Sequence, residues 1–245
     1  MAAAHDRVRE KENFDFDWKF ILNADDRANA GMQVSEAGWQ DVQLPHDWSI
    51  SQNFDPKLSG SNGHLPGGIG WYRKTFRVDK KDKGRRIAVL FDGIYSRSDV
   101  YVNGQHLGFR PYGFCYQEYD LTPYLNYGAE NVLAVRVNNP LEHDSVARWY
   151  TGAGIYRHAW LVKTAEVHVA SYGTYVTTPV VTAERAEVRV RTSVANEAER
   201  TKTLSVRQQI TDGEGRTVVQ SGKQALQVAA GQTADTEHTL EIPRP

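Results

Sequence analysis

The amino-acid sequence predicts an all-β protein with two β-sandwich domains. Apolar residues rarely recur with the 3.6-residue period of a helix. Period-2 alternation instead returns in short segments separated by turn residues, which is typical of β-sandwiches and barrels. A change in composition near residue 165 marks a domain boundary, because all six tryptophans and ten of the twelve tyrosines precede it. A chain of 245 residues has room for two domains of ordinary size.

The strands of the first domain are predicted from alternation and from one turn dipeptide. Trp71–Phe76 and Arg86–Phe91 read as strands. Asp99–Val102 leads into Asn103-Gly104, a dipeptide that tolerates positive φ at both central positions of a type I′ turn. Gln105–Phe109 is therefore the expected return strand of a hairpin.

A further strand is predicted over Asn131–Val137. Val132, Ala134 and Arg136 point to one side of this segment, and the apolar residues between them point to the other. Since one side carries an arginine, we expect a strand that is buried on one face only.

The second domain, residues 165–245, is predicted to resemble an immunoglobulin-like β-sandwich, because alternating segments recur in it at the spacing typical of that fold. The predicted elements are the strand Glu187–Val194 with its valines on one face, the strand Leu204–Ile210, the hairpin turn Asp212-Gly213 and the strand Thr236–Ile242. Neither a turn nor a strand follows at Pro243-Arg244-Pro245, so this sandwich is expected to be incomplete, without its last element.

The first 13 residues are predicted to be disordered or removed by processing. Met1–Ala4 resembles the small-residue end of a signal peptide, and Asp6–Asn13 is rich in charge. This start favours a periplasmic or secreted protein over a cytoplasmic one, although the single cysteine, Cys115, suits the cytoplasm equally well.

Composition argues against several classes of partner. A net charge of -1 provides no basic excess for nucleic acid, and no apolar run approaches the 18 residues of a membrane-spanning helix. The lone Cys115 excludes an internal disulfide, and no His-x-x-x-His or Cys-x-x-Cys spacing suggests zinc. We therefore expect neither a metal nor a cofactor.

The motifs of several enzyme classes are missing. Gly152-Ala153-Gly154 is followed by Arg157 where a dinucleotide-binding fingerprint requires glycine, and no P-loop lysine follows a glycine cluster. No serine lies in a Gly-x-Ser-x-Gly elbow, and His46 and Asp47 are sequence neighbours whose side chains diverge on an extended segment. No catalytic residue is assigned.

Glycoside hydrolysis usually requires two carboxyl groups, and the 30 acidic residues reveal no such pair. Asn196-Glu197 is a candidate, because an Asn-Glu dipeptide carries the acid/base in many barrel glycosidases. Here it lies in the polar stretch Asn196–Lys202 between two predicted strands, where a solvated hairpin turn is the expected structure.

Aromatic residues with polar edges are dense in the first domain. Such rings stack on the C–H face of a sugar while their N–H or O–H groups bond its hydroxyls, but most tryptophans of a sandwich belong to its core. Trp18, Trp39, Trp71 and Trp160 lie in or beside alternating runs and are expected in the core. Trp48 and Trp149 lie in turn-rich stretches, where both interpretations stay open.

Six motifs of the first domain occur in the order known from one family. They are Leu-Pro-His-Asp-Trp (44–48), Gly-Gly-Ile-Gly-Trp-Tyr-Arg-Lys-Thr-Phe (67–76), Phe-Asp-Gly-Ile-Tyr (91–95), Val-Tyr-Val-Asn-Gly (100–104), Asp-Leu-Thr-Pro-Tyr-Leu (120–125) and Arg-Trp-Tyr-Thr-Gly-Ala-Gly-Ile-Tyr-Arg (148–157). From about Phe14 to Val162 the chain resembles the sugar-binding N-terminal domain of glycoside hydrolase family 2. The resemblance implies a jelly-roll β-sandwich over residues 14–164, then the immunoglobulin-like sandwich, within an enzyme whose (β/α)8 barrel holds both catalytic glutamates.

The resemblance also suggests where substrate is contacted. In the family, the loop before Gly-Ile-Tyr-Arg helps shape the subsite for the terminal sugar, often with an aspartate at the position that Arg148 occupies here. Arginine offers donors where aspartate offers acceptors, so Arg148 either contacts a hydroxyl with reversed polarity or holds the loop by an ion pair. Trp149 follows it. Asn62 and His64, in the glycine-rich loop Ser59–Gly70, either reach substrate or belong to a mobile connector.

The resemblance therefore implies that the chain is the non-catalytic N-terminal part of a β-galactosidase-like retaining glycosidase. Its expected partners are a β-linked glycoside, a galactoside first, and the catalytic barrel of the same polypeptide, with a homo-oligomer as a further option. β-Glucuronidases and β-mannosidases share the plan of the first domain. A stand-alone jelly-roll carbohydrate-binding module and a structural or protein-interaction β-sandwich remain alternatives.

Overall fold

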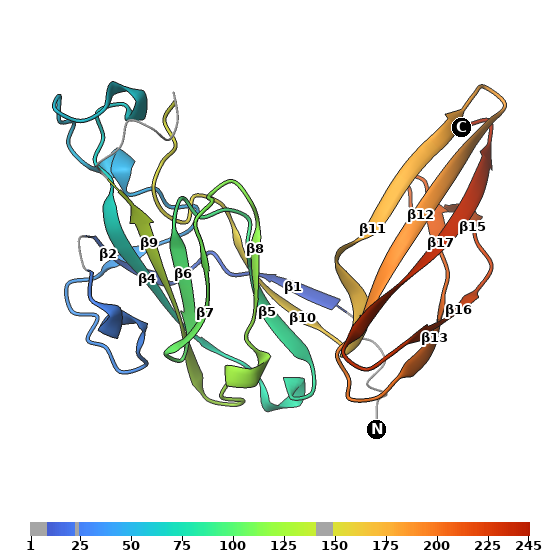
Figure 1. The fold of residues 1–245 in the computed structure, drawn as a ribbon, viewed down its shortest axis with the longest axis horizontal. Helices are drawn as coiled ribbons and strands as arrows, with labels where there is room; N and C mark the ends of the chain where they lie inside the picture. The colour runs from blue at the N-terminus through green and yellow to red at the C-terminus, as the bar shows by residue number, and fades with distance from the viewer. Residues whose placement is uncertain (1–8, 23–24, 141–148) are drawn as a thin grey trace. The chain divides into compact units, whose positions relative to one another are not determined.

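The computed structural model describes residues 9–22, 25–140 and 149–245. It consists of strands and short 3-10 helices, so the all-β prediction is confirmed (Figure 1). The chain forms two compact units, one with residues Glu10–Lys163 and the other with Thr164–Pro245. Within the described residues, the helices fall short of the length and apolar character that crossing a membrane requires.

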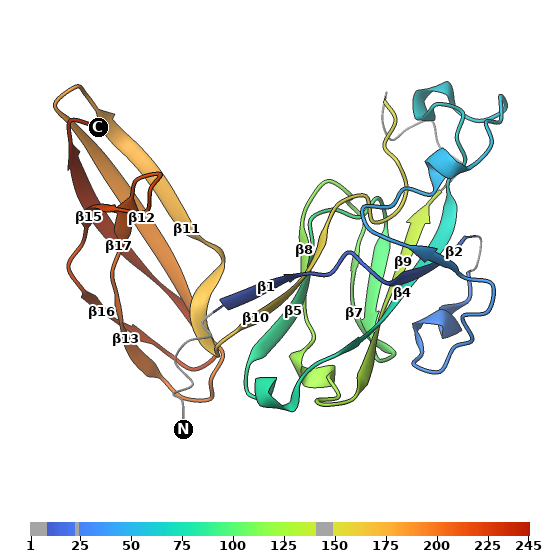
Figure 2. The same cartoon turned by 180° about the vertical axis from the view of Figure 1, so that it is seen from behind.

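The first unit is a sandwich of two sheets, as the jelly-roll prediction requires. Its six-stranded sheet has the order β3-β2-β4-β9-β6-β7, and its four-stranded sheet has the order β1-β10-β5-β8 (Figures 1 and 2). The strands are β1 (Arg9–Asn13), β2 (Trp18–Leu22), β3 (Gln40–Val42), β4 (Gly68–Arg77), β5 (Arg86–Phe91), β6 (Ser98–Val102), β7 (Gln105–Arg110), β8 (Gln117–Asp120), β9 (Glu130–Asn139) and β10 (Ala159–Thr164). The 3-10 helices are η1 (Arg27–Ala30), η2 (Ser49–Ser51), η3 (Gly60–Asn62), η4 (Lys80–Asp82) and η5 (Thr122–Tyr124).

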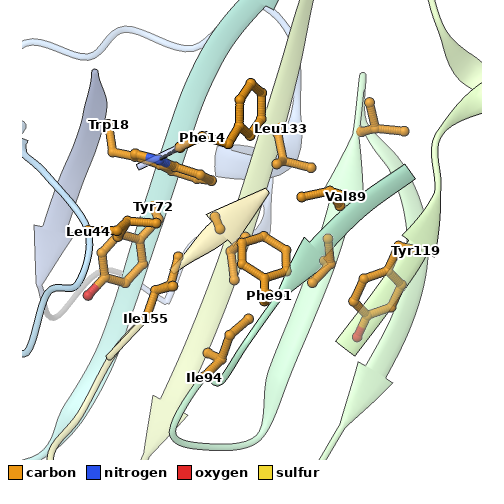
Figure 3. Close-up of a cluster of buried hydrophobic side chains, with 14 of the residues drawn as sticks. Phe14, Trp18, Leu44, Tyr72, Val89, Phe91, Ile94, Tyr119, Leu133 and Ile155 are labelled. Carbon is orange, nitrogen blue, oxygen red and sulfur yellow. Dashed lines mark hydrogen bonds between the residues drawn. The ribbon is translucent and has the colours of Figure 1, made fainter. Parts of the chain in front are cut away.

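The core of the first unit lies between its two sheets (Figure 3). Trp18 and Tyr72 come from the six-stranded sheet and Phe91 from the four-stranded sheet, and the rings of Trp18 and Phe91 are 6.3 Å apart. All three side chains are almost completely buried. Fully burying one aromatic ring removes roughly 150–250 Å² from water, so these rings contribute much of the stability of the sandwich.

The predicted hairpin at Asn103-Gly104 is confirmed. Asn103 has φ 51° and Gly104 has φ 85°, the left-handed values that a type I′ turn requires at both positions. The Asn103 side chain also accepts a hydrogen bond from the Val132 amide at 2.8 Å, which ties the turn to β9.

The expectation that Asn131–Val137 is buried on one face only is wrong, because all seven residues are buried. One face of β9 lines the sandwich core. The other contributes Ala134 to a second apolar cluster with Trp71 and Tyr101, against which the half-buried Trp39 packs. The loop between β2 and β3 covers this outer face, and strand alternation alone gives no sign of such a cover.

Arg73 anchors this covering loop. Its guanidinium is almost fully buried and donates to the carbonyl oxygens of Asn29 at 2.5 Å and Gly31 at 2.7 Å. Its Nε donates to the Glu36 carboxylate at 2.9 Å. A buried arginine on a strand is therefore satisfied by the loop that buries it.

The predicted disorder over residues 1–13 is wrong for residues 9–13, which form strand β1 beside β10. The charges that suggested disorder have partners there. Glu10 forms an ion pair with Arg85 at 3.1 Å, Glu12 forms one with Lys163 at 2.9 Å, and the Lys11 ammonium lies 3.9 Å from the centre of the Trp160 ring. Residues 1–8 lie outside the described part of the chain.

The second unit has the sandwich architecture predicted for it. Its strands are β11 (Val167–Val181), β12 (Arg185–Asn196), β13 (Lys202–Val206), β14 (Gln209–Thr211), β15 (Thr217–Gln220), β16 (Gln224–Val228) and β17 (Gln232–Pro243). They form the sheet β11-β12-β17 and the pairs β13-β16 and β14-β15. Val188 and Val190 of β12 are buried with Leu240 of β17, which confirms the predicted apolar face of β12.

Three local predictions for the second unit need correction. The segment Leu204–Ile210, predicted as one strand, contains the end of β13 and the start of β14. Between these strands, Gln208 exchanges hydrogen bonds with Ser221. The turn at Asp212-Gly213 is longer than two residues, and its left-handed residue is Gly215, with φ 80°. The Asp212 carboxylate closes this turn by accepting from the Arg216 amide at 2.9 Å.

The third correction concerns Asn196, which was expected in a solvated hairpin turn but is completely buried. Its amide donates to the carbonyl oxygens of Arg200 at 2.8 Å and Val228 at 3.0 Å, and its carbonyl accepts from the Ala198 amide at 3.1 Å. Asn196 thus fixes the connection between β12 and β13, which belong to different sheets.

Candidate functional site

The candidate site is a group of loops at one end of the first unit, where β4 begins and β9 ends. Gly68 of β4 pairs with Asn139 of β9, and the Asn139 side chain donates to the Gly152 carbonyl at 3.2 Å. We call residues 46–66 and 149–154 the loop cluster. Figure 1 shows it at the upper left, with the blue and teal turns η2 and η3 beside the yellow segment that leads to β10.

Asp47 joins the two parts of the loop cluster. One carboxylate oxygen accepts from the Ser49 and Ala153 amides, both at 3.0 Å, and the other accepts from the Tyr150 hydroxyl at 2.5 Å. Burial raises the pKa of the Tyr150 hydroxyl well above its ordinary value, and the hydrogen bond to Asp47 adds to this effect. Tyr150 therefore stays a hydrogen-bond donor at neutral pH, and both Asp47 oxygens are occupied.

Two glycines permit this close approach. Gly152 has φ 74°, and a Cβ there would meet an Asp47 carboxylate oxygen at 2.7 Å. Gly154 has φ 124°, and a Cβ there would meet the Tyr72 hydroxyl at 2.3 Å and the His46 carbonyl at 2.7 Å. Glycine is therefore required at both positions for two reasons, a positive φ and the absence of a side chain.

His46 and Asp47 have separate partners. The His46 Nδ1 lies 2.8 Å from the buried Tyr72 hydroxyl, and its ring packs on Phe20 at 4.9 Å. Burial lowers the pKa of His46, with Asp47 opposing the shift, so the neutral ring is favoured near neutral pH. Trp48 is completely buried and stacks on Phe20 at 5.5 Å, so of its two interpretations the core one holds.

The described residues that were predicted to contact substrate differ from one another in exposure and in hydrogen bonding. The Trp149 side chain is 63% exposed. Indole rings are usually well buried in folded proteins, so this exposure is unusual. Asn62 is half-buried and lies close to the same segment, because the Thr151 hydroxyl donates to its carbonyl oxygen at 3.4 Å. His64 is exposed, and its Nδ1 donates to the Leu58 carbonyl at 2.8 Å, within its own loop. Arg148 lies outside the described residues.

The loop Ser59–Gly70 is more regular than a glycine-rich connector. Gly68–Gly70 belong to β4, and residues 60–62 form η3, which Ser59 caps by accepting from the Ser61 amide. The Ser49 hydroxyl donates to the Pro66 carbonyl at 2.7 Å and so ties η2 to the end of this loop.

The chemistry of the loop cluster suits recognition better than bond cleavage. It offers an exposed indole ring together with the amide of Asn62 and the hydroxyl of Thr151, whose hydrogen bonds within the protein are long, at 3.4 Å. Such groups bind neutral polyhydroxy ligands. Glycoside hydrolysis usually uses carboxyl groups that face the substrate, but hydrogen bonds within the protein hold both oxygens of Asp47. Among the described residues, no group of three or more His, Cys, Asp or Glu side chains could hold a metal ion.

Sequence reasoning missed the roles of Asp47 and Tyr150. Both lie inside quoted motifs, but nothing in the sequence pairs residues that are 103 positions apart. The adjacent glycines were the available signal, since Gly152 and Gly154 mark a segment that needs close packing against another part of the chain.

Comparison with known proteins agrees with this fold. A model of the sugar binding domain of glycosyl hydrolases family 2 matches residues 12–165. The beta-galactosidase BoGH2A of Bacteroides ovatus is 42% identical over 245 residues, which cover 97% of this chain and 28% of that protein. A beta-glucuronidase of Formosa agariphila is 32% identical over 264 residues, which cover 97% of this chain and 26% of that protein.

Solved structures give the same relationship. A family 2 glycosyl hydrolase from Bacteroides cellulosilyticus matches with a TM-score of 0.86 and 39% identity, covering 96% of this chain and 32% of that one. A family 2 beta-glucuronidase matches with a TM-score of 0.87 and 31% identity, covering 97% of this chain and 27% of that one. This chain thus spans about a third or less of the length of each of these four relatives.

Proposed function

The chain belongs to glycosyl hydrolase family 2, and we propose that it is the sugar-recognition part of a β-galactosidase-like enzyme that hydrolyses terminal β-glycosidic bonds. One observation carries this proposal: the loop cluster of a family 2 sugar-binding domain holds an exposed tryptophan beside hydrogen-bonding groups. The Bacteroides ovatus relative is named a beta-galactosidase, which supports a galactoside as the first substrate to test.

In this proposal, the loop cluster forms one side of the subsite for the terminal sugar. The Trp149 ring stacks on a C–H face of the sugar, and Asn62 bonds a hydroxyl. Asp47 has a positioning role, because its carboxylate accepts hydrogen bonds from Tyr150 and Ala153, which both lie in the segment that follows Trp149. His64 is exposed and holds its own loop through a hydrogen bond from Nδ1 to the Leu58 carbonyl, and it remains a predicted contact. Arg148 remains a predicted contact.

Cleavage is assigned to another part of a longer polypeptide. Hydrolysis with retention uses two carboxyl groups about 5–5.5 Å apart, one protonated and one ionised. Asp47, the acid most closely built into the loop cluster, is fully engaged in hydrogen bonds. We therefore propose that the catalytic pair lies in a (β/α)8 barrel of the same polypeptide, which the loop cluster borders.

A Trp149→Ala variant tests the proposed contact. The variant is made in the extended polypeptide, meaning this chain continued to the length of its family 2 relatives, and kcat/KM is measured on chromogenic β-galactosides and β-glucuronides. Loss of one stacking contact is expected to lower kcat/KM for the preferred sugar about tenfold, mainly through KM, since about 1.4 kcal/mol corresponds to a factor of ten.

Phe54→Ala is the matched control for Trp149→Ala. Phe54 is 74% exposed, lies in the same loop cluster and has no assigned contact, so its truncation is expected to leave kcat/KM unchanged. Unchanged kinetics in Trp149→Ala would remove this residue from the sugar subsite.

A further inference from the structure

A second group of exposed aromatic residues lies on the loop between β7 and β8, outside the loop cluster. Tyr112 is 62% exposed, Phe114 is 46% exposed and Tyr116 is 48% exposed. Arg97, Arg110 and Arg157 are exposed in adjoining segments. We call these six residues the aromatic–arginine surface. Monomeric proteins rarely gather large exposed rings in this way unless the surface binds something.

Packing and hydrogen bonds within the first unit hold the loop of the aromatic–arginine surface in place. The Phe114 ring packs on the buried Tyr95 ring at 5.2 Å and meets the Tyr112 ring edge-on at 5.8 Å. Gly113 is buried beneath it, where a Cβ would meet the Tyr95 ring at 2.4 Å, and its carbonyl accepts from the Tyr156 hydroxyl at 2.9 Å. Ordering these rings on binding would therefore cost little conformational entropy.

The arginines adjoin the rings. The Arg97 amide donates to the Pro111 carbonyl at 3.3 Å, immediately before Tyr112. Arg157 directly follows Tyr156, whose hydroxyl donates to the Gly113 carbonyl of the loop at 2.9 Å. Arg110 is the last residue of β7 and begins the loop.

The stretch from Gly93 to Gln117, which contains five of the six residues of the surface, is rich in arginine relative to acids. Between Gly93 and Gln117 the only acidic residue is Asp99, which is 5% exposed and already paired with His106 at 2.9 Å. The same stretch contains no lysine. The buried centre of a protein–protein interface has the same composition, since it is enriched in aromatic residues and arginine and depleted of lysine and acidic residues.

We propose that the aromatic–arginine surface is where this unit docks an acidic, partly apolar face of the remaining domains of its own polypeptide. The inference rests on the proposed function, in which a longer polypeptide contains the catalytic barrel. The length of the family 2 relatives, of which this chain matches 26–32%, supplies a partner of the required size. A second copy of the chain fits poorly, because a two-fold interface would bring like charges of the three arginines together. A sugar fits less well than protein, because Phe114 offers no polar edge and its ring packs on Tyr95.

The single cysteine provides the probe. Cys115 lies within the loop, is half-buried and places its thiol 3.6 Å from the Tyr112 carbonyl. Its alkylation rate is measured by mass spectrometry of the peptide that contains it, in the 245-residue chain and in the extended polypeptide. Docking is expected to slow alkylation at least about tenfold in the extended polypeptide, because the loop then reacts only when the interface opens.

Charge reversal separates docking from other causes of slow reaction. Arg97→Glu combined with Arg157→Glu in the extended polypeptide is expected to restore most of the alkylation rate of the 245-residue chain. The two introduced carboxylates would repel an acidic partner and so weaken docking. Arg207→Glu, at an exposed arginine of the second unit, is the control and is expected to keep Cys115 protected.

Each outcome has a distinct meaning. An extended polypeptide that hydrolyses glycosides while Cys115 reacts as fast as in the 245-residue chain overturns this inference and leaves the proposed function intact. Protection of Cys115 without any glycosidase activity supports docking and contradicts the proposed function. Protection of Cys115 in the 245-residue chain by added galactose or galactosides would assign the surface to sugar and overturn the docking proposal.

Discussion

Replacing Asp47 by alanine is expected to lower the kcat/KM of the extended polypeptide on its preferred β-glycoside about 100-fold, the scale of a displacement of roughly 1 Å at a binding site. The substitution removes the acceptor for the Ser49 and Ala153 amides and for the Tyr150 hydroxyl. The segment that follows Trp149 then keeps the backbone hydrogen bonds from the His46 and Trp48 amides to the Ile155 and Ala153 carbonyls, and loses every side-chain bond to Asp47. Steady-state kinetics with a chromogenic glycoside measures the effect.

Two further variants define the cause of that loss. Asp47→Asn keeps an oxygen acceptor for the two amides and is expected to recover part of the activity. Asp55→Ala removes a carboxylate of the same loop that accepts from the nearby Lys57 amide at 2.9 Å, and it is expected to behave like the unaltered protein. Wild-type kinetics in Asp47→Ala would show that the position of the Trp149 segment does not matter for catalysis.

Replacing Gly154 by alanine is expected to destabilise the first unit by about 3–5 kcal/mol, the sum of backbone strain and overpacking. The residue has φ 124°, and its new Cβ would lie 2.3 Å from the Tyr72 hydroxyl and 3.3 Å from the Trp48 ring. Neither neighbour moves easily, because both side chains are completely buried. Tryptophan fluorescence during urea unfolding reports this unit selectively, since all six tryptophans precede residue 164.

Gly38→Ala is the matched control for Gly154→Ala. Gly38 also has a positive φ, 82°, but nothing lies within 4 Å of a Cβ built there. Its substitution introduces backbone strain alone and is expected to cost about 1 kcal/mol. Equal shifts of the urea midpoint in both variants would mean that the contacts with Tyr72 and His46 contribute nothing.

Local patterns predicted the parts of the fold that depend on local chemistry. The type I′ turn at Asn103-Gly104 follows from two residues that tolerate positive φ, and the apolar face of β12 follows from its alternating valines. The second buried face of β9 could not be predicted in this way. It depends on a covering loop that Arg73 of a different strand holds in place.

In the candidate site, too, features that depend on nearby residues were predicted, and contacts between distant residues were not. The exposed Trp149 and the neighbouring Asn62 were predicted as site residues, the first from its turn-rich surroundings and the second from its loop. The hydrogen bonds that assemble the loops were not predicted, because they join Asp47 to Tyr150 and Ala153 across more than 100 residues. A sequence motif marks such residues as a group without stating which of them touch.

We propose that this chain recognises the sugar of a β-glycoside while another part of the polypeptide cleaves the bond. The most direct measurement compares hydrolysis of a chromogenic β-galactoside by the 245-residue chain and by the extended polypeptide under identical conditions. We predict turnover by the extended polypeptide alone, followed by other β-glycosides if galactosides are poor substrates. Turnover by the 245-residue chain itself, or no glycosidase activity in the extended polypeptide, would contradict the account.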